Sequence, residues 1–278
     1  VLLVLSVVLV AVAPAFAAPA EEKPVIVIAA FGCSLDSGLA NLNDFDKMVR
    51  ERFPGYDVRW ALTAGFIINK LQEAGIDTIF DSEMPVKSLD EVYEDLRQEG
   101  KTDVVVQMLM VMTGAEMRQV LGYSTNGLNV KYGFPLLFSP ENIQNTANAL
   151  ASEFGGEGTA TIICAHGNEE HPDFNAPLIQ MDQYLRENYD NVFLATVEGP
   201  PGFEAVREEV AASGAESVKF VPMMMVSGDH ITNDVMGDEP ESWKVLLGLP
   251  AEASSGMASN PDVMALFLNG IEALVSQF

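Results

Sequence analysis

The chain of 278 residues is 48% hydrophobic and carries 40 Asp and Glu against 15 Lys and Arg, a formal net charge of −25. This size and hydrophobic content are enough for one large or two ordinary domains with a packed core, and they exclude a globally disordered chain. The strong acidity argues against nucleic acid as a partner, because proteins that bind phosphate backbones need clustered cations.

Residues 1–17, VLLVLSVVLVAVAPAFA, contain no charged side chain. The apolar run Val1–Val12 is shorter than the ~20 residues that span a bilayer, and it leads to the small-x-small sequence Ala15-Phe16-Ala17. We therefore predict a secretory signal peptide over residues 1–17 and a mature protein in the periplasm; the alternative is a membrane anchor that stays attached. No later apolar run reaches spanning length, so we expect no membrane contact after cleavage.

From Pro24 onward, short apolar runs alternate with amphipathic segments that have helix start and stop signals. The predicted strands are residues 25–30, 58–62, 103–112, 159–164, 191–196 and 217–226. The predicted helices are residues 43–53, 65–74, 89–99, 140–154, 177–188, 203–213 and 261–278, while residues 122–138 look like a loop or a short strand pair. This alternation predicts an α/β fold with parallel sheets and right-handed crossovers.

The two halves of the chain resemble each other. Ala30-Phe31-Gly32 matches Ala165-His166-Gly167, and Val106–Val111 matches Val221–Val226. A third match lies between them and pairs Val58, Ala61 and Gly65 with Val192, Ala195 and Gly199. Three matches in the same order predict two similar α/β domains, residues 24–148 and 149–278, whose sheets face each other across a cleft. The last predicted helix, 261–278, is a candidate to pack on the N-terminal domain.

The second half places ionisable residues at three predicted strand ends: His166, Glu198 and His230. The equivalent first-half positions are Phe31, Ala64 and Glu116. Because the carboxyl ends of parallel strands converge on one edge of a sheet, we expect the three ionisable side chains to meet. Two imidazoles and one carboxylate suit a divalent-metal site or an acid–base set. His171, in the same loop as His166, is interpreted as a solvated histidine.

An acidic loop with Asp234, Asp238 and Glu239 follows His230. It is a candidate to gather metal cations, and the alternative is an ordinary solvated turn. Cys33 and Cys164 each follow an apolar strand, so buried thiols are favoured, although a disulfide between them stays open.

Four segments carry a resemblance to a known family: AAFGCS after the first strand, VRWALTAGFIINKL, ICAHGN, and VPMMMVSGDHITNDVMGDEPESWK. They resemble the anaerobic sirohydrochlorin cobaltochelatases, class II chelatases related to protoporphyrin ferrochelatase. The likeness runs from about Pro24 to the end, and the GDH…ND…GDE…SWK string is its most specific part.

The resemblance implies two Rossmann-like, chelatase-like domains with a tetrapyrrole cleft between them, and ATP-independent insertion of Co²⁺, with Fe²⁺ or Ni²⁺ as other metals, into sirohydrochlorin. The family's catalytic and metal-binding His, Glu and His fall on His166, Glu198 and His230. The expected substrate-binding residues of the first domain are Phe31, Gly32, Met110 and Glu116. A homo-oligomer is expected as well.

One departure concerns the stretch Leu109–Glu116, where relatives commonly have LHxxPGEE. Here Met110 replaces the His and Thr113 replaces the Pro. If that His binds metal or haem in relatives, Met110 is a candidate soft axial ligand to haem iron, and core packing is the alternative. Candidates to bind the carboxylates of the substrate are Arg59, Arg118 and Lys131.

Two other functions stay open. One is a periplasmic carrier of a tetrapyrrole, haem or metal built on a chelatase fold, because an exported chelatase lacks an obvious substrate supply. The other is a two-lobed substrate-binding protein of a transport system. The intact set of His166, Glu198 and His230 favours the enzyme.

Overall fold

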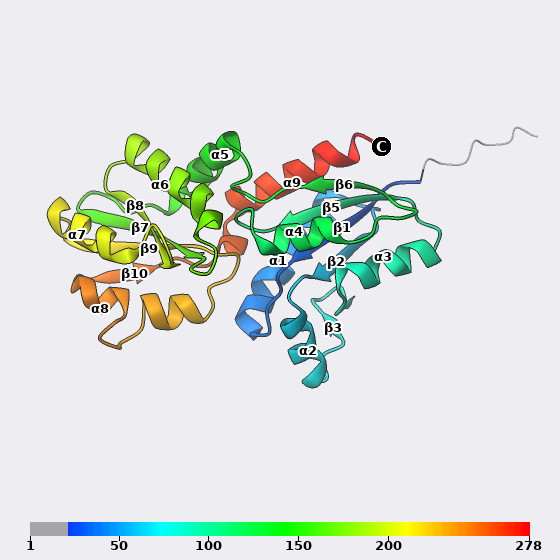
Figure 1. The fold of residues 1–278 in the computed structure, drawn as a ribbon, viewed down its shortest axis with the longest axis horizontal. Coiled ribbons are helices and arrows are strands. Elements are labelled where there is room, and N and C mark those ends of the chain that lie inside the picture. Colours follow the sequence, from blue (N-terminus) through cyan, green and yellow to red (C-terminus); the bar gives the residue numbers. More distant parts are fainter. Residues whose placement is uncertain (1–21) are drawn as a thin grey trace, which may run out of the picture.

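The computed structural model describes residues 22–278, so the predicted signal peptide over residues 1–17 lies outside the described range. In this part of the chain two four-stranded parallel sheets lie side by side along the long axis of the molecule (Figure 1). The prediction of an α/β fold with parallel sheets is confirmed. No helix in residues 22–278 is both long enough and apolar enough to cross a bilayer.

The first sheet has the strand order β2-β1-β5-β6. Its strands are β1 (Val25–Ala30), β2 (Val58–Leu62), β5 (Asp103–Leu109) and β6 (Asn129–Gly133). Every residue of β1 is buried, as expected for a parallel strand with helices on both faces of its sheet. The helices of this half are α1 (Asp36–Arg52), α2 (Gly65–Glu73), α3 (Leu89–Gln98) and α4 (Ala115–Gly122). A small antiparallel hairpin pairs β3 (Thr78–Ile79) with β4 (Met84–Pro85).

The second sheet has the order β10-β9-β7-β8. Its strands are β7 (Thr159–Gly167), β8 (Val192–Glu198), β9 (Ser217–Met223) and β10 (Ala251–Ala253). Read from β8, this order matches the order of the first sheet. Strand β7 is equivalent to β1, β8 to β2 and β9 to β5. These are the pairs that the internal sequence repeat predicts.

The helices of the second half are α5 (Pro140–Leu150), α6 (Ala176–Asn188), α7 (Phe203–Ser213), α8 (Trp243–Leu247) and α9 (Pro261–Val275). Shorter helices are η1 (Ala151–Glu153), η2 (Pro172–Asn175), the π-helix η3 (His230–Val235) and η4 (Met257–Ser259). The predicted domain boundary between residues 148 and 149 falls inside α5.

Helix α9 leaves the second half and packs on β5 and β6 of the first sheet (Figure 1). The helix begins at Asn260, whose Oδ1 accepts hydrogen bonds from the backbone N–H groups of Asp262 and Val263. Phe267 of α9 meets Phe45 of α1 edge to face, with ring centroids 6.2 Å apart. One continuous core cluster therefore contains residues of both sheets, for example Ile28 of β1 and Ile163 of β7.

Both cysteines are buried free thiols, as the sequence favours. Cys33 belongs to the shared core, whereas Cys164 lies in the core on the other face of the second sheet. Burial raises the pKa of the Cys164 thiol well above its ordinary value, which keeps it protonated and unreactive near neutral pH.

Candidate functional site

Two histidines, one at the end of a strand and one in the segment that follows the neighbouring strand, come together at the carboxyl edge of the second sheet. His166 lies near the end of β7, and His230 begins η3, which follows β9. Their ring centroids are 4.7 Å apart and the rings are almost perpendicular, at 88°. Because β7 and β9 are paired in parallel register, their ends bring side chains far apart in sequence to the same edge.

Each ring has one nitrogen already engaged. Nδ1 of His166 is 2.9 Å from the carbonyl oxygen of Gly167, and Nδ1 of His230 is 2.6 Å from the carboxylate of Asp234. Both contacts fit a neutral imidazole whose Nδ1–H donates. Nε2 is then the nitrogen of each ring whose lone pair remains for a metal ion or a proton.

Asp234 reaches His230 because the two residues lie one turn apart on η3. Short π-helical turns of this kind are frequent at functional sites. The rest of the predicted acidic loop behaves differently: Asp238 accepts a hydrogen bond of 2.7 Å from Lys244, which lowers the pKa of Asp238, and Glu239 is exposed. Of the three acidic residues, only Asp234 contacts the histidine pair.

The structure does not bring the carboxylate of Glu198 to the two imidazoles. Glu198 pairs with Gly167 across the β7–β8 ladder, and in a regular pleat this register starts its side chain on the opposite face from His166. Within residues 22–278 no three side chains of His, Cys, Asp or Glu are grouped closely enough to hold a metal ion. The histidine pair is thus the part of the predicted set that is assembled.

The ends of β7 and β8 approach so closely that only glycine fits at position 167. A Cβ on Gly167 would overlap the carbonyl oxygen of Glu198, and its φ of +76° lies in the left-handed region. Asn175 connects the segments that follow β7 and end β8, because its Nδ2 donates to the carbonyl oxygens of Asn168 and Glu198, both at 3.2 Å. The Asn175 side chain is fully buried, so the loop after His166 is tied to the end of β8.

Sequence reasoning missed Asn175. It stands just before α6, where an Asn usually serves as an N-cap, yet its side chain makes no capping hydrogen bond. Its Oδ1 is buried and has no hydrogen-bond partner in residues 22–278.

Some of the first-domain residues predicted to bind substrate lie at the surface, and one lies in the core. Phe31, directly after β1, is 43% exposed and meets Phe66 of α2 edge to face at 5.6 Å. Gly32 follows with a φ of +97°, and Glu116 lies half-buried in the first turn of α4. Met110 is only 8% exposed and packs in the core of the first sheet, so we assign it to the core rather than to haem iron.

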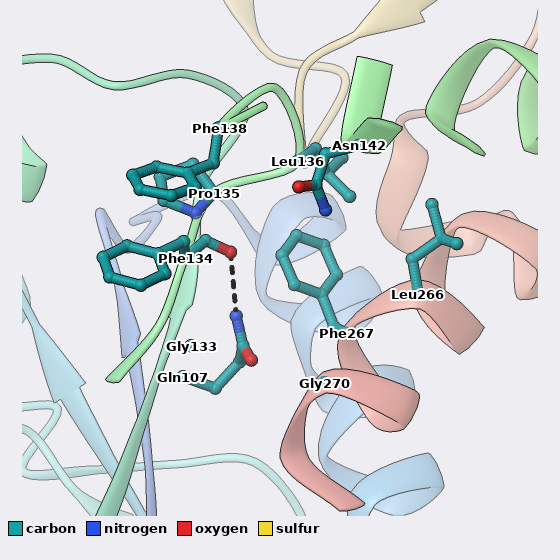
Figure 2. Close-up of a pocket in the computed structure, with 10 residues that line it drawn as sticks. All are labelled: Gln107, Gly133, Phe134, Pro135, Leu136, Phe138, Asn142, Leu266, Phe267 and Gly270. Carbon is teal, nitrogen blue, oxygen red and sulfur yellow. Dashed lines mark hydrogen bonds between the residues drawn. The ribbon is translucent and has the colours of Figure 1, made fainter. Parts of the chain in front are cut away.

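Two cavities of the described chain lie away from the histidine pair. One of about 160 Å³ lies between the end of the first sheet and α9, where Nε2 of the buried Gln107 donates to the carbonyl of Phe134 (Figure 2). A small-molecule site usually needs about 300 Å³ or more, so this cavity is too small for a macrocycle. A more open hollow of about 440 Å³ lies between the end of β8, α7 and α8, and neither site histidine lines it.

Comparison with known proteins identifies the family. A family model described as cobalt chelatase (CbiK) matches residues 24–276. The sirohydrochlorin cobaltochelatase CbiKC of Nitratidesulfovibrio vulgaris is 30% identical over 238 residues, which cover 80% of this chain and 78% of that protein. The sirohydrochlorin cobaltochelatase of Salmonella typhimurium is 27% identical over 258 residues, which cover 88% of this chain and 94% of that protein.

Solved structures agree on the fold. The chelatase SirB of Bacillus subtilis, in a structure with Fe³⁺, matches with a TM-score of 0.62 at 14% identity, over 92% of this chain and 96% of that chain. A structure of the sirohydrochlorin chelatase SirB from Bacillus subtilis subspecies spizizenii in complex with cobalt has a TM-score of 0.58, with the same identity and coverage. The match over residues 24–276 shows that the chain belongs to the CbiK family of cobalt chelatases.

Proposed function

We propose that the chain catalyses the insertion of Co²⁺ into sirohydrochlorin, without ATP, which forms nitrogen–metal bonds. Family membership and two relatives named as sirohydrochlorin cobaltochelatases support this function. The structural observation that carries it is the pair of imidazoles 4.7 Å apart at a sheet edge, each with Nδ1 engaged. Neutral imidazole is a good ligand for divalent first-row metals and a good proton acceptor near pH 7.

The reaction replaces two pyrrole N–H protons of the macrocycle by one divalent metal ion. Nε2 of one histidine holds the incoming Co²⁺, and Nε2 of the other takes a pyrrole proton as the metal–nitrogen bonds form. We assign the second proton to Glu198, which ends the neighbouring strand, and its transfer requires the carboxylate to turn toward His166 when substrate binds. Asp234 fixes the orientation of the His230 ring through its hydrogen bond to Nδ1.

For the macrocycle itself we propose the exposed aromatic pair Phe31 and Phe66. The two rings lie after neighbouring strands of the first sheet, where they offer an apolar contact surface for a flat ring system. Fe²⁺ and Ni²⁺ are proposed as alternative metals, because two imidazoles do not by themselves distinguish among these ions.

The proposed place of action is the periplasm, on the basis of the charge-free residues 1–17. Cell fractionation with an antibody to the mature chain tests this point. Recovery of a protein that still carries residues 1–17 in the membrane fraction would favour the anchor instead.

An anaerobic chelatase assay tests the function. Protein from Ala18 onward is mixed with sirohydrochlorin and Co²⁺, and the absorbance change of the macrocycle is followed beside His166→Ala, His230→Ala and, as a matched control, His171→Ala. We expect the first two variants to lose at least 100-fold in rate, in line with removal of a proton-transfer group, and the exposed His171 variant to retain most activity. Insertion no faster than without protein, with the tetrapyrrole still bound, would make the chain a carrier.

A further inference from the structure

The positive charges of this acidic protein are almost all neutralised by its own carboxylates. Salt bridges account for most Lys and Arg side chains of residues 22–278. Arg59, one of the cations proposed from the sequence to bind substrate, is held by both Asp57 and Glu99 at 2.7 and 2.5 Å. A cation held in this way has little attraction left for a further anion.

The cations without a carboxylate partner in residues 22–278 are Lys23, Lys70, Arg118 and Lys131. Lys23 and Lys131 are engaged elsewhere, since they donate to the carbonyls of Pro54 and Gln277 and lie over the rings of Tyr56 and Phe278. Lys70 lies on α2, one helical turn after Phe66, and makes no hydrogen bond, salt bridge or cation–π contact to the second half within residues 22–278 (Figure 1). Arg118 is the fourth of these cations, and it does reach the second half.

Arg118 lies at the carboxyl edge of the first sheet and reaches the second half of the chain. Its helix α4 follows β5, and the next residue, Gln119, donates from Nε2 to the carbonyl of Thr63, just after β2. The guanidinium carbon of Arg118 is 4.6 Å from the ring centroid of Phe174. Phe174 belongs to η2, which packs against β7 shortly after His166.

The contact with Phe174 orients the guanidinium without neutralising it. An aromatic face attracts a cation but leaves its N–H donors free, and no side-chain hydrogen bond of Arg118 is formed in the described part of the chain. A planar guanidinium with free donors matches a carboxylate through two parallel hydrogen bonds. Sirohydrochlorin is a polycarboxylate, and a protein of net charge −25 repels it unless a local cation compensates.

We infer that Arg118 binds a peripheral carboxylate of the tetrapyrrole and that Phe174 holds the guanidinium in place for it. This role rests on the proposed function and adds the residue that selects a polyanionic macrocycle. Because the contact is remote from the reacting nitrogens, it acts equally in the ground state and the transition state. It therefore lowers KM and leaves kcat unchanged.

The test compares Arg118→Gln, Arg118→Lys and Phe174→Leu with Lys131→Gln, which removes the same charge from β6, where Lys131 donates to the carbonyl of Gln277. For Arg118→Gln we expect KM for sirohydrochlorin to rise at least tenfold with kcat unchanged, while the affinity for Co²⁺ alone stays within twofold of wild type. Arg118→Lys should recover part of the loss, because it keeps the charge without the paired donors, and Phe174→Leu should raise KM by a smaller factor. Lys131→Gln should match wild type.

A KM that is unchanged in Arg118→Gln, or that rises equally in Lys131→Gln, would overturn the assignment. Equilibrium binding of metal-free sirohydrochlorin, followed by its absorbance, keeps the test independent of turnover. If wild type binds the tetrapyrrole without inserting metal, the proposed enzyme function fails, and Arg118 is judged on dissociation constants alone. A dissociation constant for sirohydrochlorin that is tenfold larger in Arg118→Gln than in wild type would then support the role of Arg118, and an equal one would refute it.

Discussion

At the scale of single residues, hydrogen bonds to Nδ1 decide which nitrogen of each site histidine remains for chemistry. For His166 the acceptor is the main-chain carbonyl of Gly167, so side-chain substitution cannot remove it. For His230 the acceptor is the carboxylate of Asp234, a charged side chain that substitution can remove. The two imidazoles therefore differ in the kind of acceptor at Nδ1 although they lie 4.7 Å apart.

We predict that Asp234→Asn weakens Co²⁺ binding by about 10- to 100-fold, the usual cost of losing the carboxylate partner of a metal-binding histidine. The amide still accepts from Nδ1–H but supplies no charge. Isothermal titration with Co²⁺ measures the effect. Asp238→Asn removes the same charge from the same loop, where Lys244 is its partner, and should stay within twofold of wild type. Equal losses in both variants would mean that Asp234 acts only as a general cation attractor.

A second prediction concerns alkaline pH. Burial holds the pKa of Cys164 above its ordinary value of 9.0, so the folded protein keeps this proton more firmly than the unfolded chain. This difference contributes fully to the free energy of unfolding below about pH 9. As pH rises further the contribution is lost, by up to about 1.4 kcal/mol per pH unit for one group. Burial also raises the pKa of Tyr93 above its ordinary value of 10.0, so this tyrosine adds to the loss of stability above about pH 10.

Urea unfolding between pH 7.5 and 10 measures this loss. Cys164→Ala lowers stability at every pH because it leaves a cavity, but its decline between pH 9 and 10 should be shallower than that of wild type. An identical decline would show that Cys164 does not titrate in this range.

At the scale of elements, the segment before α9 holds the site loop against the second sheet. Backbone N–H groups of Met257 and Ala258 donate to the carbonyls of Met224 and Met225, just after β9, at 2.9 Å. Gly256 permits this approach, because a Cβ there would lie 2.7 Å from the Cα of Val226. The path from β9 to His230 is thus fixed by main-chain contacts between two segments.

We predict that Gly256→Ala destabilises the protein by about 1–3 kcal/mol, the typical cost of overpacking a close contact. The strain falls on backbone atoms, which cannot rotate away as a side chain can. Thermal unfolding measures the change. Gly228→Ala is the matched control in the same loop, since a Cβ there meets nothing within 4 Å, and it should be close to neutral. A neutral Gly256→Ala would show that the two segments separate easily.

The sequence predicts the elements whose signal is local. Six strands of the two sheets, β1, β2, β5, β7, β8 and β9, are predicted to within three residues at either end, because apolar runs between breakers define them. The first turns of α1 were missed since Gly38 lies there, where it packs directly against Cys33. Strand β10 was missed because three residues, Ala251–Ala253, join the sheet through backbone pairing with β9 and carry no pattern.

The site was predictable to the same extent. Parallel strand ends converge, so the meeting of His166 and His230 follows from topology. The place of Glu198 depends on register at the β7–β8 edge, which sequence spacing does not specify. The contact between Asp234 and His230 depends on the helical turn of η3, in a stretch that reads as an irregular acidic loop.

At the scale of the whole molecule, the two halves share one core, and α9 crosses from the second half to the first sheet. The shared cluster includes Trp60 of β2, Leu194 of β8 and Phe267 of α9. Neither sheet can lose its packing without exposing apolar surface of the other, so the halves are coupled in stability.

We therefore predict one cooperative unfolding transition. The chain has two tryptophans, Trp60 in the first half and Trp243 in the second, both buried. Trp243→Phe leaves Trp60 as the fluorescence reporter, and Trp60→Phe leaves Trp243. In each variant the fluorescence midpoint in urea should coincide with the midpoint from far-UV circular dichroism. Two separated midpoints in either variant would show that the halves unfold independently.

The return of α9 to the first sheet also orders events in time. While a chain is being synthesised, an N-terminal domain ordinarily completes its folding before the next one emerges. Here one face of β5 and β6 stays uncovered until the 15 residues of α9 have been made. The first half therefore completes its packing only after the second half has been synthesised. A chain that finishes folding so late leaves this apolar face accessible to chaperones for most of its synthesis.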